Sequence, residues 1–183
     1  EFFTVLVSGP IASGLSYVMW TPEGYGCQHP EVDDDHKKLF DLINGLIDTL
    51  KSSKPNTAMV GEAIRGLREY TVYHFNREIK MLEKCPTYPA EKMSAHKAAH
   101  ASFVGKVVEF EQKFAGENLA AVVQLVSGDM LTFLSNWLVQ HIQGTDMKLH
   151  EHFDSMSLEK SLKAAGVDID VLSSHLLNHL KSD

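Results

Sequence analysis

The chain has 183 residues, of which 44% are hydrophobic and 22% charged, so it can form one globular domain with additional segments. Its formal net charge is -7, which argues against a nucleic-acid partner because no basic surface is available for phosphates. Two cysteines, Cys27 and Cys85, are too few for a disulfide framework. We interpret them as free thiols in a reducing, cytoplasmic compartment, with a single bridge between them as the alternative.

The first 31 residues show no helical period and are predicted to form an extended N-terminal arm. Residues 2–22 carry no charge and are almost long enough to span a bilayer. Glycine, proline and hydroxyl side chains interrupt this apolar run, and no basic flank marks a signal peptide. A docked arm is therefore favoured over a membrane or targeting remnant, and we expect no membrane contact from the remaining domain.

Four amphipathic helices are expected after the arm. The first begins near Asp33, where acidic residues suit the positive end of the helix dipole, and it ends near Lys51. Apolar side chains then recur in steps of three and four residues over 60–81, 93–114 and 123–141. Short loops between such stripes predict an all-α fold, an up-down-up-down four-helix bundle spanning residues 32–153.

Residues 154–183 are predicted to form a short C-terminal helical tail, broken near Gly166, rather than a second domain. His175 and His179 are four residues apart in this tail, but they lie among leucines without a nearby carboxylate. A second metal site there is not favoured. The tail could instead connect the bundle to an attached signalling domain or to a protein partner.

Seven potential metal ligands fall on the apolar stripes of the four helices or next to them. A buried polar group without a partner costs roughly 2–7 kcal/mol, so a single buried histidine is usually satisfied by hydrogen bonds. Seven such groups in one core are satisfied more readily by metal ions. The candidates are His36, His74, Glu78, His96, His100, His141 and Asp146.

The spacing of these residues favours one shared site. Residues four apart on a helix differ by only about 40°, so the ligand pairs of the second and third helices each face one way. His141 and Asp146 are five residues apart, or about 140° on an ideal helix. Asp146 can therefore reach the site only if the helix widens locally, which Gly144 would ease.

The donor types indicate iron. Structural zinc takes four ligands, often thiolates, whereas a mixed set of imidazoles and carboxylates suits two iron ions bridged by the carboxylates. Neutral imidazoles leave positive charge on the metal and stabilise the ferrous pair. This charge balance favours reversible O2 binding over full oxygen activation.

The complete pattern resembles the hemerythrin signature. It comprises His36, His74-x-x-x-Glu78, His96-x-x-x-His100 and His141-x-x-x-x-Asp146, and Asp33-x-x-His36-x-x-Leu39-Phe40 resembles the bacterial branch. The resemblance covers residues 20–153 and fills all seven ligand positions. Ile79 departs from it, since family members often carry a second glutamate there.

The resemblance implies two iron ions with an oxo or hydroxo bridge. One iron would be held by His96, His100 and His141, and the other by His36 and His74. The pair would be bridged by Glu78 and Asp146. O2 would bind the second iron in a pocket lined by Leu39, Trp137, Leu138 and Ile142.

The function expected from these observations is reversible O2 binding at a non-haem di-iron centre, for oxygen sensing, storage or transport. The alternative is an enzyme: a di-iron oxidase, a peroxidase or a protein that processes nitric oxide. The ligand set favours a binding protein over an enzyme, because the sequence offers no acid/base pair beside the open iron position.

Overall fold

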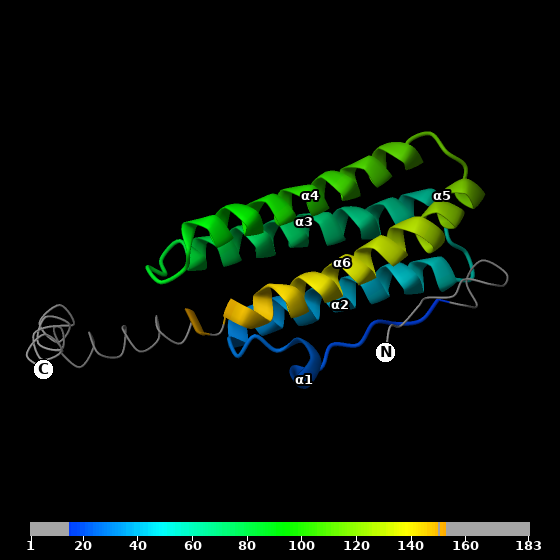
Figure 1. Cartoon of the computed structure of the whole chain (residues 1–183). Helices are drawn as coiled ribbons and strands as arrows, with labels where there is room; N and C mark the ends of the chain where they lie inside the picture. The colour runs from blue at the N-terminus through cyan, green and yellow to red at the C-terminus, as the bar shows by residue number, and fades with distance from the viewer. Residues whose placement is uncertain (1–14, 150, 153–183) are drawn as a thin grey trace, which may run out of the picture.

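A computed structural model describes residues 15–149 and 151–152, and within this range all regular secondary structure is helical. Four long helices lie side by side and alternate in direction (Figure 1). The second packs against the first and third, and the fourth closes the bundle against the first. The predicted all-α four-helix bundle is thereby confirmed, whereas the predicted tail, 154–183, lies outside the described residues.

The helix boundaries agree with the predicted stripes to within a few residues. The fourth long helix consists of two α-helical parts joined by a π turn, and one short helix precedes the four long helices in the chain while another follows them. The elements are α1 (Pro22–Tyr25), α2 (Pro30–Lys51), α3 (Thr57–Leu82), α4 (Ala90–Phe114), α5 (Leu119–Leu125), η1 (the π turn, Val126–Met130), α6 (Leu131–Gly144) and η2 (a 3-10 helix, Asp146–Leu149).

The N-terminal arm is less extended than predicted. Thr21 accepts a hydrogen bond from the Gly24 backbone at 3.2 Å, and this cap, with Pro22 in the first turn, starts α1 inside the arm. α2 begins at Pro30 rather than near Asp33, because a proline fits the first turn of a helix. The prediction of one extended segment up to residue 31 is therefore wrong in these two places.

The remaining described part of the arm is docked onto the bundle. The backbone of Val18 donates a hydrogen bond to Asn44 on α2 at 2.9 Å and accepts one from the same side chain at 2.8 Å. Leu15 is buried in the main hydrophobic core. These contacts agree with the prediction of a docked arm, as far as residues 15–21 are concerned.

The fourth helix has a buried apolar side chain at every fourth position, and Val123 and Leu131 are buried next to this stripe. The stripe consists of Val122, Val126, Met130, Leu134, Leu138 and Ile142. On an ideal α-helix each four-residue step rotates the stripe by about 40°, so the stripe would leave the core after a few turns. The π turn at Val126–Met130 contains an extra residue per turn, so each residue in it rotates by less than in an α-helix. This reverses part of the drift of the stripe.

The same segment is the one described helix that is long and apolar enough to cross a membrane. Counted from Leu119 to Leu149, its most apolar window has a mean hydropathy of 1.3, and 44% of that window is buried inside the bundle.

Ile64 on α3 provides a test of the core packing. It is fully buried, whereas Met59 on the same helix is 43% exposed. Ile64→Ala should lower the free energy of unfolding by about 2–5 kcal/mol, because it leaves a cavity in the core. Met59→Ala should change it by less than about 0.5 kcal/mol. Urea unfolding of both variants makes the comparison, and equal losses would contradict the packing described.

Candidate metal centre

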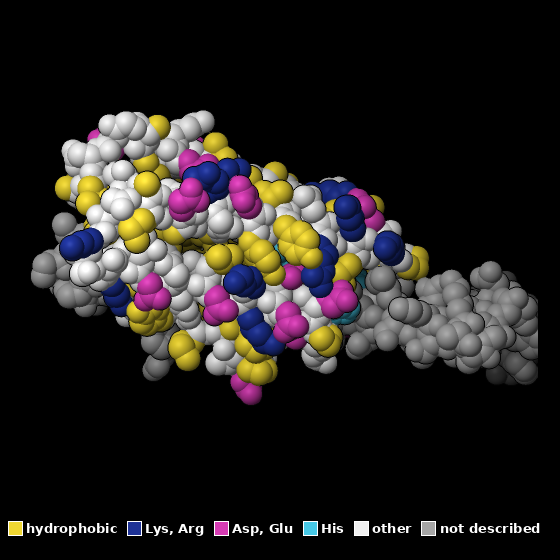
Figure 2. All heavy atoms as spheres, turned by 180° about the vertical axis from the view of Figure 1, so that it is seen from behind, with side chains coloured by type: hydrophobic (Ala, Val, Ile, Leu, Met, Phe, Trp, Pro, Cys, Tyr) yellow, Lys and Arg dark blue, Asp and Glu magenta, His cyan; other side chains and the backbone are white. Residues whose placement is uncertain are grey.

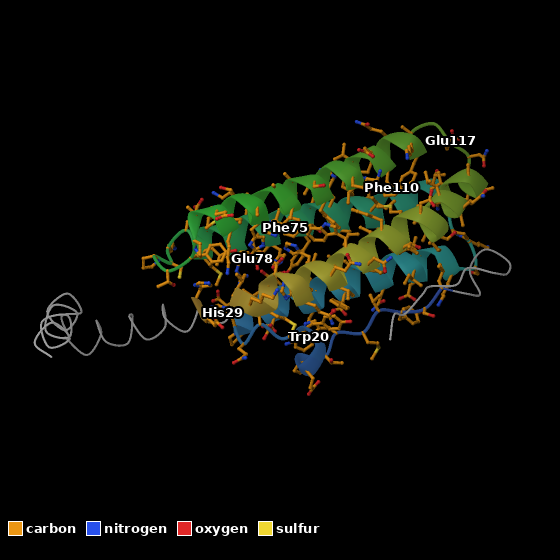
Figure 3. The ribbon with its side chains drawn as sticks, viewed as in Figure 1. Trp20, His29, Phe75, Glu78, Phe110 and Glu117 are labelled. Carbon is orange, nitrogen blue, oxygen red and sulfur yellow. The ribbon has the colours of Figure 1, made fainter. Side chains whose placement is uncertain are left out.

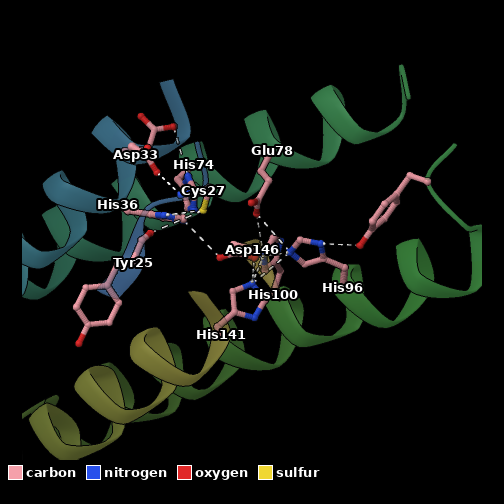
Figure 4. Close-up of polar contacts among 12 residues, drawn as sticks. Tyr25, Cys27, Asp33, His36, His74, Glu78, His96, His100, His141 and Asp146 are labelled. Atoms are coloured by element: carbon pink, nitrogen blue, oxygen red, sulfur yellow. Dashed lines mark hydrogen bonds and ion pairs between the residues drawn. The ribbon is translucent and has the colours of Figure 1, made fainter. Parts of the chain in front are cut away.

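The seven predicted ligand residues meet at one end of the bundle, where α2 and α4 begin and α3 and α6 end (Figures 3 and 4). All seven are buried, with exposed fractions between 0% for His36 and 7% for His141. Histidine scarcely reaches the molecular surface on the face shown in Figure 2, where basic, acidic and hydrophobic side chains are interspersed. The site is therefore enclosed by the bundle.

One group of donor atoms surrounds the His141 imidazole. Its Nε2 atom lies 2.9 Å from Nε2 of His100 and 3.2 Å from Nε2 of His96. Glu78 Oε2 is 3.3 Å from His96 Nε2, and Asp146 Oδ1 is 3.2 Å from His141 Nε2. Two donors bound to one ion at about 2.1 Å and a right angle are separated by about 3 Å. These separations therefore fit donors arranged around a single ion.

A second group of donors adjoins the first. His36 and His74 lie with their ring centroids 4.9 Å apart and, with Glu78, offer donor atoms within 4.8 Å of one another. Asp146 connects the two groups, since its Oδ2 is 3.4 Å from His36 Nε2 while its Oδ1 faces His141 (Figure 4). The two groups share both carboxylates, as two bridged ions would require.

Several of these buried atoms lack a hydrogen bond within the described chain. They are both carboxylate oxygens of Glu78 and of Asp146, Nε2 of His36 and Nδ1 of His100. Buried carboxylates without such partners are costly unless a cation compensates them. The donor set therefore fits a pair of metal ions better than a network of hydrogen bonds.

Asp146 reaches the site because the helix ends before it. α6 terminates at Gly144, and Thr145 leaves the helical conformation with φ -122° and ψ -62°. The chain then resumes as the 3-10 helix η2, which begins at Asp146 itself. The predicted local widening around Gly144 is thus wrong: a break in the helix removes the 140° offset expected from an ideal helix.

Three of the five histidines make a second contact through Nδ1. Such contacts orient a ring and direct its Nε2 toward the metal. The partners are Asp35 for His74 at 3.3 Å, Tyr88 for His96 at 3.4 Å and Cys27 for His36 at 3.7 Å. Each partner comes from a different segment than its histidine, so no sequence spacing indicated these roles.

Asp35 belongs to a network that extends to the surface. It accepts hydrogen bonds from Tyr70 at 2.9 Å and from Arg77 at 3.2 Å, and Arg77 also pairs with Glu31 at 3.1 Å. Burial alone would raise the pKa of Asp35, but the hydrogen bonds from His74 and Tyr70 and the charge of Arg77 hold it below its usual value. Asp35 therefore stays ionised behind His74.

The two carboxylates also control protonation in the metal-free site. Burial lowers the pKa of His96, but the Asp146 and Glu78 carboxylates, 3.4 and 3.3 Å from its Nε2 atom, outweigh that effect and raise the value to about 9. Burial lowers the pKa of His100 to about 2, and the neighbouring imidazoles of His96 and His141 add to that effect. A proton on His96 thus compensates part of the carboxylate charge when no cation is bound.

The four residues predicted to line an O2 pocket lie in the hydrophobic core beside the ligands. Leu39, Leu138 and Ile142 are buried, and Trp137 stacks on His141 with ring centroids 4.3 Å apart. Their role in O2 binding stays a prediction.

Phe75 packs even more closely against a ligand, and the sequence reasoning missed it. Its ring is parallel to that of His100 at a centroid distance of 3.6 Å. It also borders a surface groove of about 610 Å³ between α3 and α4, and His100 is among the residues that line this groove. The one available signal was its position directly after His74 and one helical turn before Glu78.

Comparisons with known proteins extend over the whole bundle. The family described as "Hemerythrin HHE cation binding domain" matches residues 29–153. The chain is 32% identical over 133 residues to a bacteriohemerythrin of Methylococcus capsulatus, covering 72% of this chain and 93% of that protein. It is 33% identical over 116 residues to a bacteriohemerythrin of Stenotrophomonas maltophilia, covering 63% and 68%.

A solved structure supports the same relationship. The crystal structure of a wild-type hemerythrin matches with a TM-score of 0.63 and 28% sequence identity, covering 75% of this chain and 98% of that one.

The raised pKa of His96 leads to a test of metal binding. At pH 7 this imidazole carries a proton that a cation must displace, so loading the metal-free protein with zinc(II) should release at least one proton. The binding constant should rise about tenfold per pH unit up to pH 9 and level off above it. Calorimetry in buffers of different ionisation enthalpy measures this release, and its absence at pH 7 would contradict the described electrostatics.

Proposed function

Because the chain belongs to the hemerythrin family, we propose that its bundle binds O2 reversibly at a non-haem di-iron centre, for oxygen sensing, storage or delivery. The observation that carries this proposal is the pair of adjacent donor groups that share Glu78 and Asp146. One ion cannot use all seven donors, whereas two bridged ions can.

The proposed ligand set follows this grouping. One iron would be held by His96, His100 and His141, and the other by His36 and His74. Both irons would be bridged by Glu78 and Asp146. Only two histidines belong to the second iron, which therefore keeps a position open for O2. A set of imidazoles and carboxylates without thiolate supports iron rather than structural zinc.

The described residues around the second iron support binding rather than catalysis. A ferrous pair would supply the two electrons that O2 takes up on binding and returns on release. Leu39 and Ile142 are buried beside the ligands and would exclude water and acid from this position. The neighbouring titratable groups of Asp35 and Cys27 contact Nδ1 atoms on the outer side of His74 and His36 instead of facing the centre.

The two cysteines bear on the proposed compartment. Neither Cys27 nor Cys85 forms a disulfide, and both thiols are buried. This supports a reducing compartment, which we take to be the cytoplasm.

Iron content tests the ligand assignment. After anaerobic loading with a ferrous salt, the chain should hold two irons. Glu78→Ala should lose one or both, because it removes a carboxylate that joins the ions and offsets their charge. Glu83→Ala is the matched control: this glutamate follows α3 and pairs with Lys97 at the surface, so iron content should not change. A single iron in the parent, or equal losses in the two variants, would refute the assignment.

Reversibility tests the function. Leu39→Ala should retain both irons but oxidise faster in air, since it opens the apolar wall. Leu50→Ala provides the control, because it lies in the same helix with similar burial, far from the site. Both should lose about 2–5 kcal/mol of stability. Only Leu39→Ala should impair recovery of the diferrous spectrum after O2 is removed. A parent protein that never releases O2 but consumes a reductant continuously would establish the oxidase alternative.

A further inference from the structure

The two histidines of the second donor group have chemically different partners behind them. His74 Nδ1 contacts the Asp35 carboxylate at 3.3 Å. By contrast, His36 Nδ1 contacts the Cys27 thiol at 3.7 Å, as Figure 4 shows. A carboxylate is a strong acceptor and the sulfur of a thiol is a weak one. Two ligands proposed for the same ion therefore receive unequal support.

Cys27 is held firmly in place. Its backbone N–H donates to Asp33 Oδ1 at 2.7 Å, which ties the residue to the first turn of α2, one turn before His36. The side chain is completely buried in a small apolar cluster with Val32, Leu82 and Leu149. The sulfur therefore cannot turn away from the imidazole without disrupting this cluster.

The hydrogen-bonding capacity of the thiol matches its surroundings. His36 Nε2 points toward Asp146 at 3.4 Å, so a metal on Nε2 leaves the ring proton on Nδ1, which donates to the sulfur. The thiol proton can in turn be donated to the Tyr25 carbonyl oxygen, 3.9 Å from the sulfur. An alanine or valine at this position would leave the Nδ1–H buried without an acceptor.

We propose that Cys27 is a positioning residue for His36, whose sulfur fixes the ring orientation and limits the donor strength of Nε2. This inference rests on the proposed function, because it assigns His36 to a metal ion. A partner behind a ligating histidine raises the ligand's basicity in proportion to its acceptor strength. The weak acceptor behind His36 keeps that ligand a poorer donor than His74 and so favours the ferrous state.

Three variants of the full chain separate this role from packing. Cys27→Ala removes the acceptor, Cys27→Val fills the space without one, and Cys27→Ser restores an acceptor with a harder oxygen. Affinity for ferrous ion and for zinc(II) is measured against a competing chelator, and the midpoint potential of the iron-loaded protein is recorded. Cys85→Ala controls for the loss of a buried thiol that contacts Thr87 and the His152 backbone instead of a proposed ligand.

Cys27→Ala and Cys27→Val should bind both metals about 10–100-fold more weakly. Cys27→Ser should recover part of that affinity. Its midpoint potential should lie below that of the parent, because an oxygen is a stronger acceptor than a thiol sulfur. Cys85→Ala should match the parent.

Packing alone predicts the opposite order. Cys27→Val would then keep the parent's affinity and potential, and Cys27→Ser would be the most damaging change; that result would overturn the positioning role. A parent that binds zinc(II) in a Cys27-dependent way but no ferrous ion would refute the di-iron function and leave the positioning role standing. A parent that binds neither metal would refute both.

Discussion

The constraint on which this structure depends is the burial of seven histidine and carboxylate side chains, the candidate metal ligands, at one end of a helical bundle. Glu78 and Asp146 bring two carboxylates into that end without hydrogen bonds to compensate them. Burying these carboxylates destabilises the metal-free fold, so binding of the proposed cations would stabilise the folded state. The apolar remainder of the bundle must therefore be stable enough to keep the donors together before loading.

The bundle separates these tasks along its length. In the part of the bundle far from the candidate ligands, apolar side chains recur in steps of three and four residues. Their packing holds the helices in register. The ligand end depends instead on how segments begin and stop. Pro30 starts α2 shortly before His36, and the termination of α6 at Gly144 releases Asp146 toward the centre. The long helices thus supply six of the seven candidate ligands, and the segment after the end of α6 supplies the seventh, Asp146.

The features that depend on the local spacing of residues could be predicted from the sequence. The stripes indicated the four long helices, and the i, i+4 ligand pairs indicated a shared site; the structure brings all seven residues together, while metal binding by them stays a prediction. The features that could not be predicted from the sequence depend on which segments the tertiary structure brings together. Asp35 meets His74 across 39 residues of chain, and nothing local marks Tyr88 or Cys27 as a partner of an imidazole. The break before Asp146 escaped for a related reason, since a glycine fits both a widened turn and a helix end.

The π turn at Val126–Met130 has a consequence for how this helix tolerates length changes. A π turn is equivalent to an α-helix with one residue inserted. Deleting a residue within it would close an ordinary helix and leave the phase of the following side chains nearly unchanged. The same deletion between the turn and His141 would rotate that ligand by about 100° away from its partners. The fourth helix therefore contains one place where its length can vary over evolution without loss of the site.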